Sequence, residues 1–207
     1  MGKALTNLSM TAQEFLVWDE TQTVRHEFMQ GEIVAMDRTQ SIAGIDERHA
    51  TAMLNVAMAL RTHLRGTPCR SFVEGIKLRV EAADCFFYPD VFVTCSANDA
   101  RDTLIKREAV LVVEVLSPGT AAYDRGEKFE AFRQLPSLRE YLLIDTVRRR
   151  CDLHRLGDDG LWVLHPSEPG VSVMLKSVDL ELTAELLWDE VPLPPAKASA
   201  SDQPATP

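Results

Sequence analysis

Two acidic residues of this sequence stand in apolar surroundings, where an unpaired carboxylate is costly. Glu114 interrupts a run of valines and leucines, and Asp90 lies in a Tyr-Pro-Asp-Val stretch flanked by phenylalanines. A buried carboxylate must be paired, protonated or bound to a cation, because its desolvation is unfavourable. Lys128 follows Glu114 after one loop. Two carboxylates on neighbouring strands and one amine can hold a hard divalent cation beside a phosphate and orient a water molecule.

Each of these residues also has a structural explanation when it is taken alone. An isolated Asp at a strand end usually belongs to a turn or caps a helix, and Glu114 could form a structural ion pair. Lys128 could pair with Asp124, four residues earlier, on a solvated helix face. Only Asp90, Glu114 and Lys128 together favour a site that binds a cation and orients a water molecule.

The elements around these residues are predicted by their local patterns. Residues 110–116 contain four valines and do not alternate, which is typical of a strand buried on both faces at the centre of a sheet. Pro89 indicates a bulge or a strand edge, because proline has no N–H for the ladder, and this would aim Asp90 away from the sheet. A break at 117–120 separates the central strand from an amphipathic helix predicted over 124–135.

The rest of the chain predicts an α+β fold, a mixed β-sheet flanked by helices. We expect one domain over residues 1–191 and a disordered tail, rich in Pro, Ala and Ser, over 192–207. The further expected helices are a short one after a capping box at Thr11, one over 45–66 and one over 182–188. The further expected strands are a hairpin of 24–29 and 32–36, and strands at 69–73, 76–81, 86–94, 141–145, 148–156, 161–164 and 171–175.

Composition restricts the classes of partner. The 207 residues are 45% hydrophobic and 26% charged, as in globular proteins, and the net charge is −9. An acidic chain should not bind nucleic acid or an anionic membrane through its overall field, so contact with phosphate requires a local basic patch or a bound cation. No apolar run approaches the roughly 18 residues that span a bilayer.

The cysteines and the N-terminal sequence predict a cytoplasmic, reduced chain. The four cysteines lack the Cys-x-x-Cys spacing of zinc sites. Cys85 and Cys95 lie within or beside apolar runs, which is typical of small core residues. The first twenty residues show no pattern of a secretory signal.

Several motifs in a fixed order resemble a known family over about residues 15–188. They resemble the Uma family of restriction endonucleases, a bacterial branch of the PD-(D/E)XK nuclease superfamily. The motifs are Arg25-His-Glu27-Phe-Met-Gln-Gly31-Glu32-Ile-Val-Ala-Met36, His49 at a helix start, Tyr88-Pro-Asp90, Glu114-Val-Leu-Ser-Pro-Gly-Thr120, Asp124-Arg-Gly-Glu-Lys128-Phe and Leu138-Arg-Glu-Tyr-Leu-Leu-Ile-Asp145.

The resemblance implies a restriction-endonuclease-like fold and hydrolysis of DNA phosphodiester bonds with Mg²⁺ or Mn²⁺. Asp90 and Glu114 would bind the metal. An N-terminal acid often completes the metal site in the superfamily; Glu32 is the first candidate and Glu27 the second. His49 would orient a ligand or contact a phosphate, or else have a structural role.

The catalytic lysine departs from the usual pattern of the superfamily. That lysine normally stands two residues after the second acid, on the same face of the strand. Position 116 is Leu in this chain. The family resemblance implies that the following helix supplies the lysine instead, which assigns Lys128 together with Asp90 and Glu114 to catalysis.

One basic stretch offsets part of the acidic charge that opposes contact with DNA. Residues 125–155 contain eight Lys or Arg against five Asp or Glu, a net charge of +3. Arg148, Arg149 and Arg150 are therefore candidates for binding the substrate. They could equally form a solvated hairpin edge that prevents pairing between sheets.

Two alternatives to an active nuclease stay open. Leu116 and the acidic total favour a catalytically inactive protein with the nuclease fold that binds DNA or a protein. A glycosidase that uses Asp90 and Glu114 would need an aromatic sugar cleft, and the three tryptophans form no cluster in the sequence. Nucleases that cut both strands often need two sites, which would favour a homodimer.

Overall fold

The valine-rich segment predicted as a central strand lies at the middle of a six-stranded mixed sheet. The computed structural model describes residues 10–36 and 46–194. The order of the strands is β11-β10-β9-β8-β6-β3; only β8 and β9 run parallel. The bounds are β3 (Arg70–Val73), β6 (Val91–Thr94), β8 (Ala109–Val115), β9 (Glu140–Asp145), β10 (Arg150–Leu156) and β11 (Trp162–Ser167).

A second, five-stranded sheet has the order β2-β1-β5-β4-β7. The predicted hairpin across Gln30 and Gly31 is confirmed, and both turn residues have the positive φ that a tight hairpin turn requires. The bounds are β1 (His26–Met29), β2 (Glu32–Ala35), β4 (Lys77–Val80), β5 (Cys85–Phe87) and β7 (Ile105–Lys106).

The chain passes from the second sheet to the first at Tyr88-Pro89-Asp90. The single strand predicted over 86–94 is wrong, since β5 ends at Phe87 and β6 begins at Val91. The break falls at Pro89, which cannot donate to a ladder. Asp90 consequently stands immediately before the first residue of β6.

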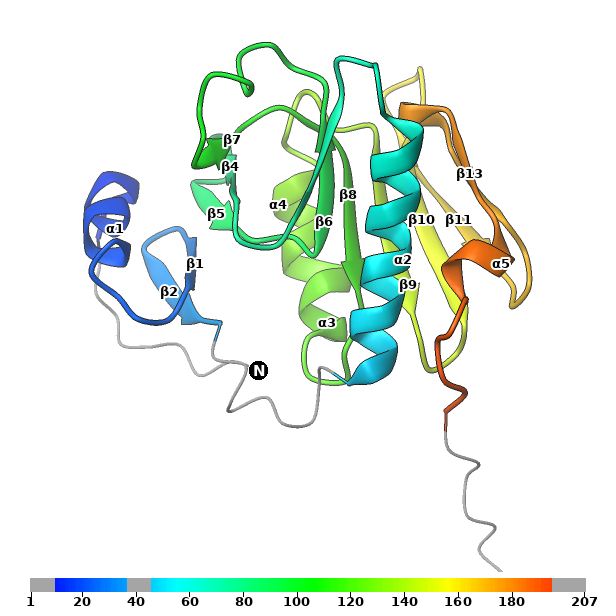
Figure 1. Ribbon diagram of the computed structural model, residues 1–207. Coiled ribbons are helices and arrows are strands. Elements are labelled where there is room, and N and C mark those ends of the chain that lie inside the picture. Colours follow the sequence, from blue (N-terminus) through cyan, green and yellow to red (C-terminus); the bar gives the residue numbers. More distant parts are fainter. Residues whose placement is uncertain (1–9, 37–45, 195–207) are drawn as a thin grey trace, which may run out of the picture.

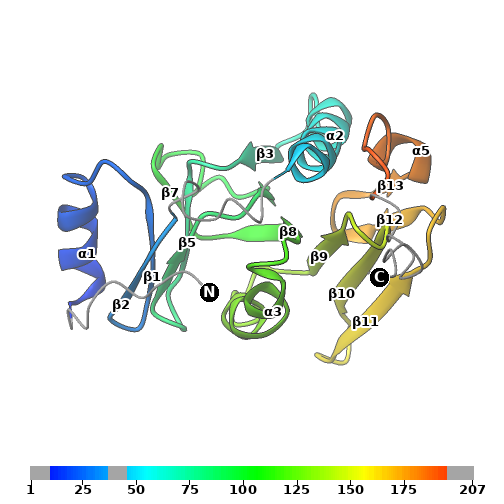
Figure 2. The ribbon, with the colours of Figure 1, turned by 90° about the horizontal axis from the view of Figure 1, so that it is seen from below.

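Helices cover both faces of the six-stranded sheet (Figure 2), so the predicted α+β class is confirmed. The long helix α2 (Glu47–His63) packs on one face through residues such as Val56 and Leu60. Phe132 packs on the other face. The segments there are α3 (Ala121–Tyr123), the π-helical turn η1 (Asp124–Lys128) and α4 (Phe129–Phe132), where one helix was predicted over 124–135.

The N-terminal helix and the C-terminal elements complete the fold (Figure 1). Helix α1 (Ala12–Asp19) has the predicted capping box and packs on the small sheet through Phe15. The C-terminal segment packs beside α2, whose Asn55 donates to the carbonyl of Leu187 at 3.2 Å. Its elements are β12 (Val173–Leu175), the 3₁₀ turn η2 (Lys176–Val178), β13 (Leu180–Leu182) and α5 (Ala184–Leu187).

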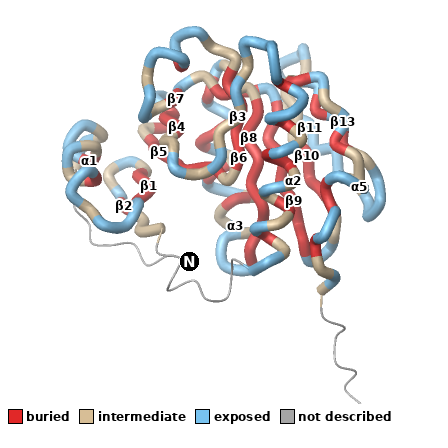
Figure 3. Tube along the Cα trace, viewed as in Figure 1, coloured by how far each residue is buried: buried red, intermediate tan, exposed pale blue. Residues whose placement is uncertain are grey.

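The buried residues concentrate in the central strands of the six-stranded sheet (Figure 3). Strands β6 and β9 are buried at every residue, and β8 at all but one. Most of the tail predicted from residue 192 lies outside the described residues, which end at 194. Among the described helices, none has the combination of length and apolar character needed to cross a membrane.

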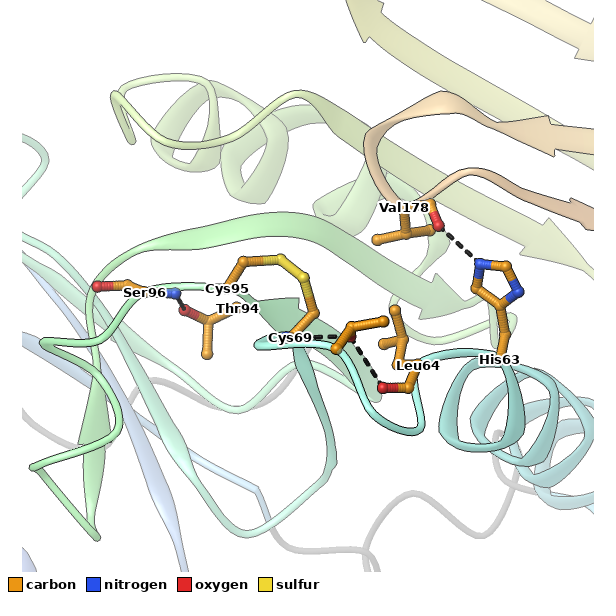
Figure 4. Close-up of a disulfide and its surroundings, with 8 residues drawn as sticks. His63, Leu64, Cys69, Thr94, Cys95, Ser96 and Val178 are labelled. Carbon is orange, nitrogen blue, oxygen red and sulfur yellow. Dashed lines mark hydrogen bonds between the residues drawn. A yellow bond between two sulfur atoms is a disulfide. The ribbon is translucent and has the colours of Figure 1, made fainter.

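A disulfide joins Cys69 to Cys95, so the expectation of reduced cysteines, with Cys95 a core thiol, is wrong for this pair (Figure 4). Arg70 pairs with Thr94 in the antiparallel ladder of β3 and β6, which brings the two flanking cysteines together. Cys85 is free and buried as predicted, and Cys151 is also free and buried. Burial raises the pKa of each of these two thiols to about 12.

Candidate active site

The amine of Lys128 lies buried among three carboxylates. Its Nζ is 3.1 Å from Glu114 Oε1, 3.3 Å from Glu27 Oε1 and 3.4 Å from Asp124 Oδ1. The Lys128 side chain is only 8% exposed. We call these four residues together with Asp90 the carboxylate cluster.

Three elements from different parts of the chain bring Lys128 to Glu114. Glu114 lies on β8 on the face that packs against α4, because its neighbours on that face, Val112 and Leu116, belong to the same core cluster as Phe132. Lys128 ends the η1 turn on that face. The hydroxyl of Tyr141 on β9 donates to the Asp124 carbonyl at 2.9 Å and ties the turn to the sheet.

Asp90 adjoins Glu114 through the pairing of β6 and β8. Val91 pairs with Val113, so the next position brings Asp90 opposite Glu114. The Asp90 N–H donates to Glu114 Oε2 at 3.3 Å. The N–H of Val115 donates to Asp90 Oδ2 at 2.7 Å. The Asp90 side chain is 16% exposed, against 4% for Glu114, so it forms the more open side of the cluster.

His49 contacts Asp90 from the first turn of α2. Its Nε2 is 3.3 Å from Asp90 Oδ2. The helix is capped by Asp46, whose Oδ1 accepts from the His49 N–H at 3.1 Å. Within the described ranges, His49 Nδ1 is buried and has no hydrogen-bond partner. Burial lowers the pKa of His49, but the hydrogen bond and charge of Asp90 outweigh it, and the pKa is raised overall.

The cluster combines four carboxyl groups with one amine, and all but Asp90 are buried. Burial raises the pKa of Glu114 well above its ordinary value; Asp90 and Asp124 act in the same direction, and Lys128 opposes them. Burial likewise raises the pKa of Glu27. Burial by itself lowers the pKa of Lys128, but the surrounding carboxylates hold it well above its usual range. The amine is therefore a fixed positive charge at neutral pH.

The donor chemistry of the cluster fits a divalent cation. In the described part of the chain, no three His, Cys, Asp or Glu side chains form a ready-made metal site. Asp90 and Glu114 nevertheless present adjacent carboxylates, which are the hard oxygen ligands that Mg²⁺ prefers. Mg²⁺ usually takes one or two protein carboxylates and keeps several waters. Asp90 and Glu114 are therefore the residues that would hold it.

Comparison with known proteins identifies the family. The model of the Uma2 family, described as "Putative restriction endonuclease", matches residues 12–186. The chain belongs to the Uma2 family. It is similar to "Uncharacterized protein slr1290" of Synechocystis sp., with 32% identity over 179 residues, which cover 86% of this chain and 91% of the relative. It is also similar to "Uncharacterized protein sll1609" of the same organism, with 33% identity over 163 residues, 77% of this chain and 88% of the relative. The family expected from the motifs is thereby confirmed.

This Uma2 chain does not bring every predicted residue into the cluster. Asp90, Glu114 and Lys128 lie together, and His49 contacts Asp90. Glu32 is exposed at the start of β2, where it pairs with Met29, whereas Glu27, the second candidate, contacts Lys128. Their functional roles remain predictions.

Position 116, where the superfamily pattern would place a lysine, is apolar in this Uma2 member. Position 116 is buried in the core cluster that packs against α4. A charged amine there would displace apolar packing, whereas Lys128 reaches the same face from the η1 turn.

Two of the three predicted arginines, Arg148 and Arg149, are held by other contacts. Arg148 pairs with Asp145 at 3.0 Å. Arg149 donates to the carbonyl of Val191 at 3.0 Å and lies over the Trp188 ring. Arg150 lies 3.9 Å from Asp152 Oδ2, and its buried Nε has no hydrogen-bond partner among the described residues. The arrangement resembles the solvated hairpin edge more than an open phosphate site.

Sequence reasoning missed the roles of two tyrosines near Lys128. Tyr141 anchors the η1 turn, as described above. The Tyr123 ring lies 5.7 Å from the Lys128 amine, and its hydroxyl is buried without a hydrogen-bond partner among the described residues. Their only sequence signal is a tyrosine beside an otherwise apolar or helical stretch, which does not distinguish them from core residues.

Proposed function

We propose that this protein is a Mg²⁺- or Mn²⁺-dependent endonuclease that hydrolyses phosphodiester bonds of DNA. The observation that carries the proposal is the Lys128 amine 3.1 Å from Glu114, whose other carboxylate oxygen accepts from the Asp90 N–H. The chain thus presents two adjacent carboxylates and one amine although position 116 is Leu. Membership of a family of restriction-endonuclease-like proteins supports the same activity.

Each residue of the cluster has a distinct part in this proposal. Asp90 and Glu114 hold the cation, and a divalent cation at their oxygens supplies charge neutralisation and lowers the pKa of a neighbouring water. Lys128 remains protonated, since its pKa is raised, so it acts as a donor and a positive charge rather than as a base. It orients the attacking water or stabilises the charge that develops on the phosphate. Glu27 and Asp124 are positioning residues that hold the amine.

The test is cleavage of supercoiled plasmid with Mg²⁺ or Mn²⁺, compared with EDTA. Glu114→Gln should abolish cleavage because a metal ligand is lost, and Lys128→Ala should reduce it by about two orders of magnitude or more. Lys176→Ala, which removes an exposed lysine far along the chain, is the matched control and should cut like the unaltered protein. Cleavage that survives Glu114→Gln would contradict the assigned metal ligand.

The second candidate function is a nuclease-fold protein without catalysis that binds DNA or a protein. Its support is the closed cluster, in which Lys128 already neutralises part of the charge that a cation would offset. Calorimetry with Mg²⁺ and Mn²⁺ separates the two functions. No heat of metal binding and no cleavage of plasmid, single strands or RNA would favour the binding module.

A further inference from the structure

One segment of this acidic chain is free of acidic residues. No Asp or Glu occurs between Glu47 and Glu74, whereas the whole chain has a net charge of −9. The C-terminal half of this segment carries three arginines, Arg61, Arg65 and Arg70. It is therefore a local basic region of the kind that an acidic protein needs in order to contact phosphate.

The three arginines line one pocket. It has a volume of about 280 Å³, and its lining also includes Thr67 and Ser71 but no acidic residue. None of the three arginines has an ion pair with another described residue. Arg125, by contrast, pairs with Asp152 at 2.9 Å. The positive charge of the pocket is thus uncompensated within the described part of the protein.

The loop between α2 and β3 builds the pocket. The helix ends at His63 with Leu64 as its C-cap, and Gly66 adopts φ +80°, which turns the chain back toward the sheet. The Thr67 hydroxyl donates to the Leu64 carbonyl at 2.8 Å and accepts from the Cys69 N–H at 3.2 Å. The Cys69–Cys95 disulfide then fastens this loop to the end of β6 (Figure 4).

The pocket is more than the basic end of a helix. Arg61 lies in the last turn of α2, and Arg65 lies just beyond it, where positive charge also complements the helix dipole. Arg70 lies on β3, where no helix dipole accounts for its positive charge. Three arginines, from the end of α2, the following loop and β3, line one pocket. The planar fork of a guanidinium matches the oxygens of a phosphate.

We propose that Arg61, Arg65 and Arg70 form a binding pocket for a phosphate group, separate from the carboxylate cluster. The pocket shares no residue with the cluster and stands without the proposed nuclease function. Figure 1 shows the two ends of α2 at opposite ends of the sheet. Twelve helical residues from His49 to Arg61 correspond to about 18 Å. A duplex advances about 3.4 Å per base pair, so for a duplex lying along α2 a backbone phosphate in the pocket would lie about five base pairs from the cluster.

The first experiment measures binding of inorganic pyrophosphate by calorimetry, in EDTA. The triple variant Arg61→Gln, Arg65→Gln, Arg70→Gln should bind at least about tenfold more weakly, because each charge-assisted hydrogen bond contributes about that factor. The control variant Arg101→Gln, Arg139→Gln, Lys176→Gln removes three exposed positive charges elsewhere and should bind like the unaltered protein. Equal pyrophosphate binding by the unaltered protein, the triple variant and the control variant would contradict the proposed phosphate-binding pocket.

The second experiment distinguishes the sources of the phosphate. Binding of a fluorescein-labelled 20-base-pair duplex is measured in EDTA at several salt concentrations, so the result does not depend on cleavage. Loss of duplex affinity in the pocket variant alone, with a salt slope reduced by about 1 for each phosphate held, assigns the pocket to a nucleic-acid backbone. Unchanged duplex binding with lost pyrophosphate binding assigns it to a small phosphate. Equal behaviour of the pocket and control variants with both probes would refute the proposal.

Discussion

Glu114 is a buried acid that shares one lysine with two other carboxylates. Because burial raises its pKa in the folded protein, it contributes stability that is fully present below its ordinary pKa of 4.5 and is lost as pH rises through the folded pKa. The melting temperature of the Glu114→Gln variant should therefore decline less above pH 4.5 than that of the unaltered protein. At pH 8 the variant should be as stable as the unaltered protein or more stable. The measurement is thermal unfolding from pH 4 to pH 9.

Glu181→Gln is the matched control for this prediction, since Glu181 is an exposed acid on β13. It should leave the pH profile unchanged. A Glu114→Gln protein with the same decline as the unaltered chain would show that the acid does not titrate as its burial predicts. A gain in stability with a loss of metal binding would fit a site that retains charge for function.

The η1 turn is the element that delivers the amine, and Tyr141 holds it. Tyr141→Phe should cost about 1–2 kcal/mol of unfolding free energy, because a buried carbonyl of Asp124 loses its donor. It should also lower kcat more than KM, since a displaced amine affects the reaction more than the binding of substrate. Urea unfolding and steady-state cleavage measure the two effects.

Tyr123→Phe, which removes the hydroxyl of another tyrosine near Lys128, offers a close comparison. Its hydroxyl is buried and has no partner among the described residues, so its removal should not destabilise the fold. Equal losses of stability in the two variants would mean that the Tyr141 hydrogen bond does not hold the turn.

The elements also mark which parts of the structure could be predicted from the sequence. The hairpin at Gln30-Gly31 and the central strand follow from local patterns, and the structure has both. The association of Asp90, Glu114 and Lys128 followed from ordered motifs. The contact of Lys128 with Glu27 rather than Glu32 could not be predicted, because it depends on how the small sheet packs against the η1 turn. The pairing of Cys69 with Cys95 depends on the register of β3 and β6, which no local pattern specifies.

At the scale of the whole molecule, the disulfide closes a loop between residues 26 positions apart. By the chain-entropy relation, such a crosslink contributes about 3.5 kcal/mol. Reduction with dithiothreitol should therefore lower the melting temperature of the unaltered protein. A variant with Cys69→Ser and Cys95→Ser should melt at the lower temperature with or without reductant. A reductant effect in that variant would point to another origin of the shift.

The assembly of the carboxylate cluster from both sheets has a consequence for biosynthesis. Glu27 comes from the small sheet and Glu114 from the large one, and Lys128 contacts both. Strand β8 also needs β9, which is synthesised later, as its parallel neighbour. A nascent chain that ends before β9 is complete at residue 145 therefore lacks part of the sheet that positions the cluster. Under the proposed function, unfinished chains would therefore not cleave the DNA of the cell that makes them, because the carboxylate cluster is completed only when the two sheets have joined.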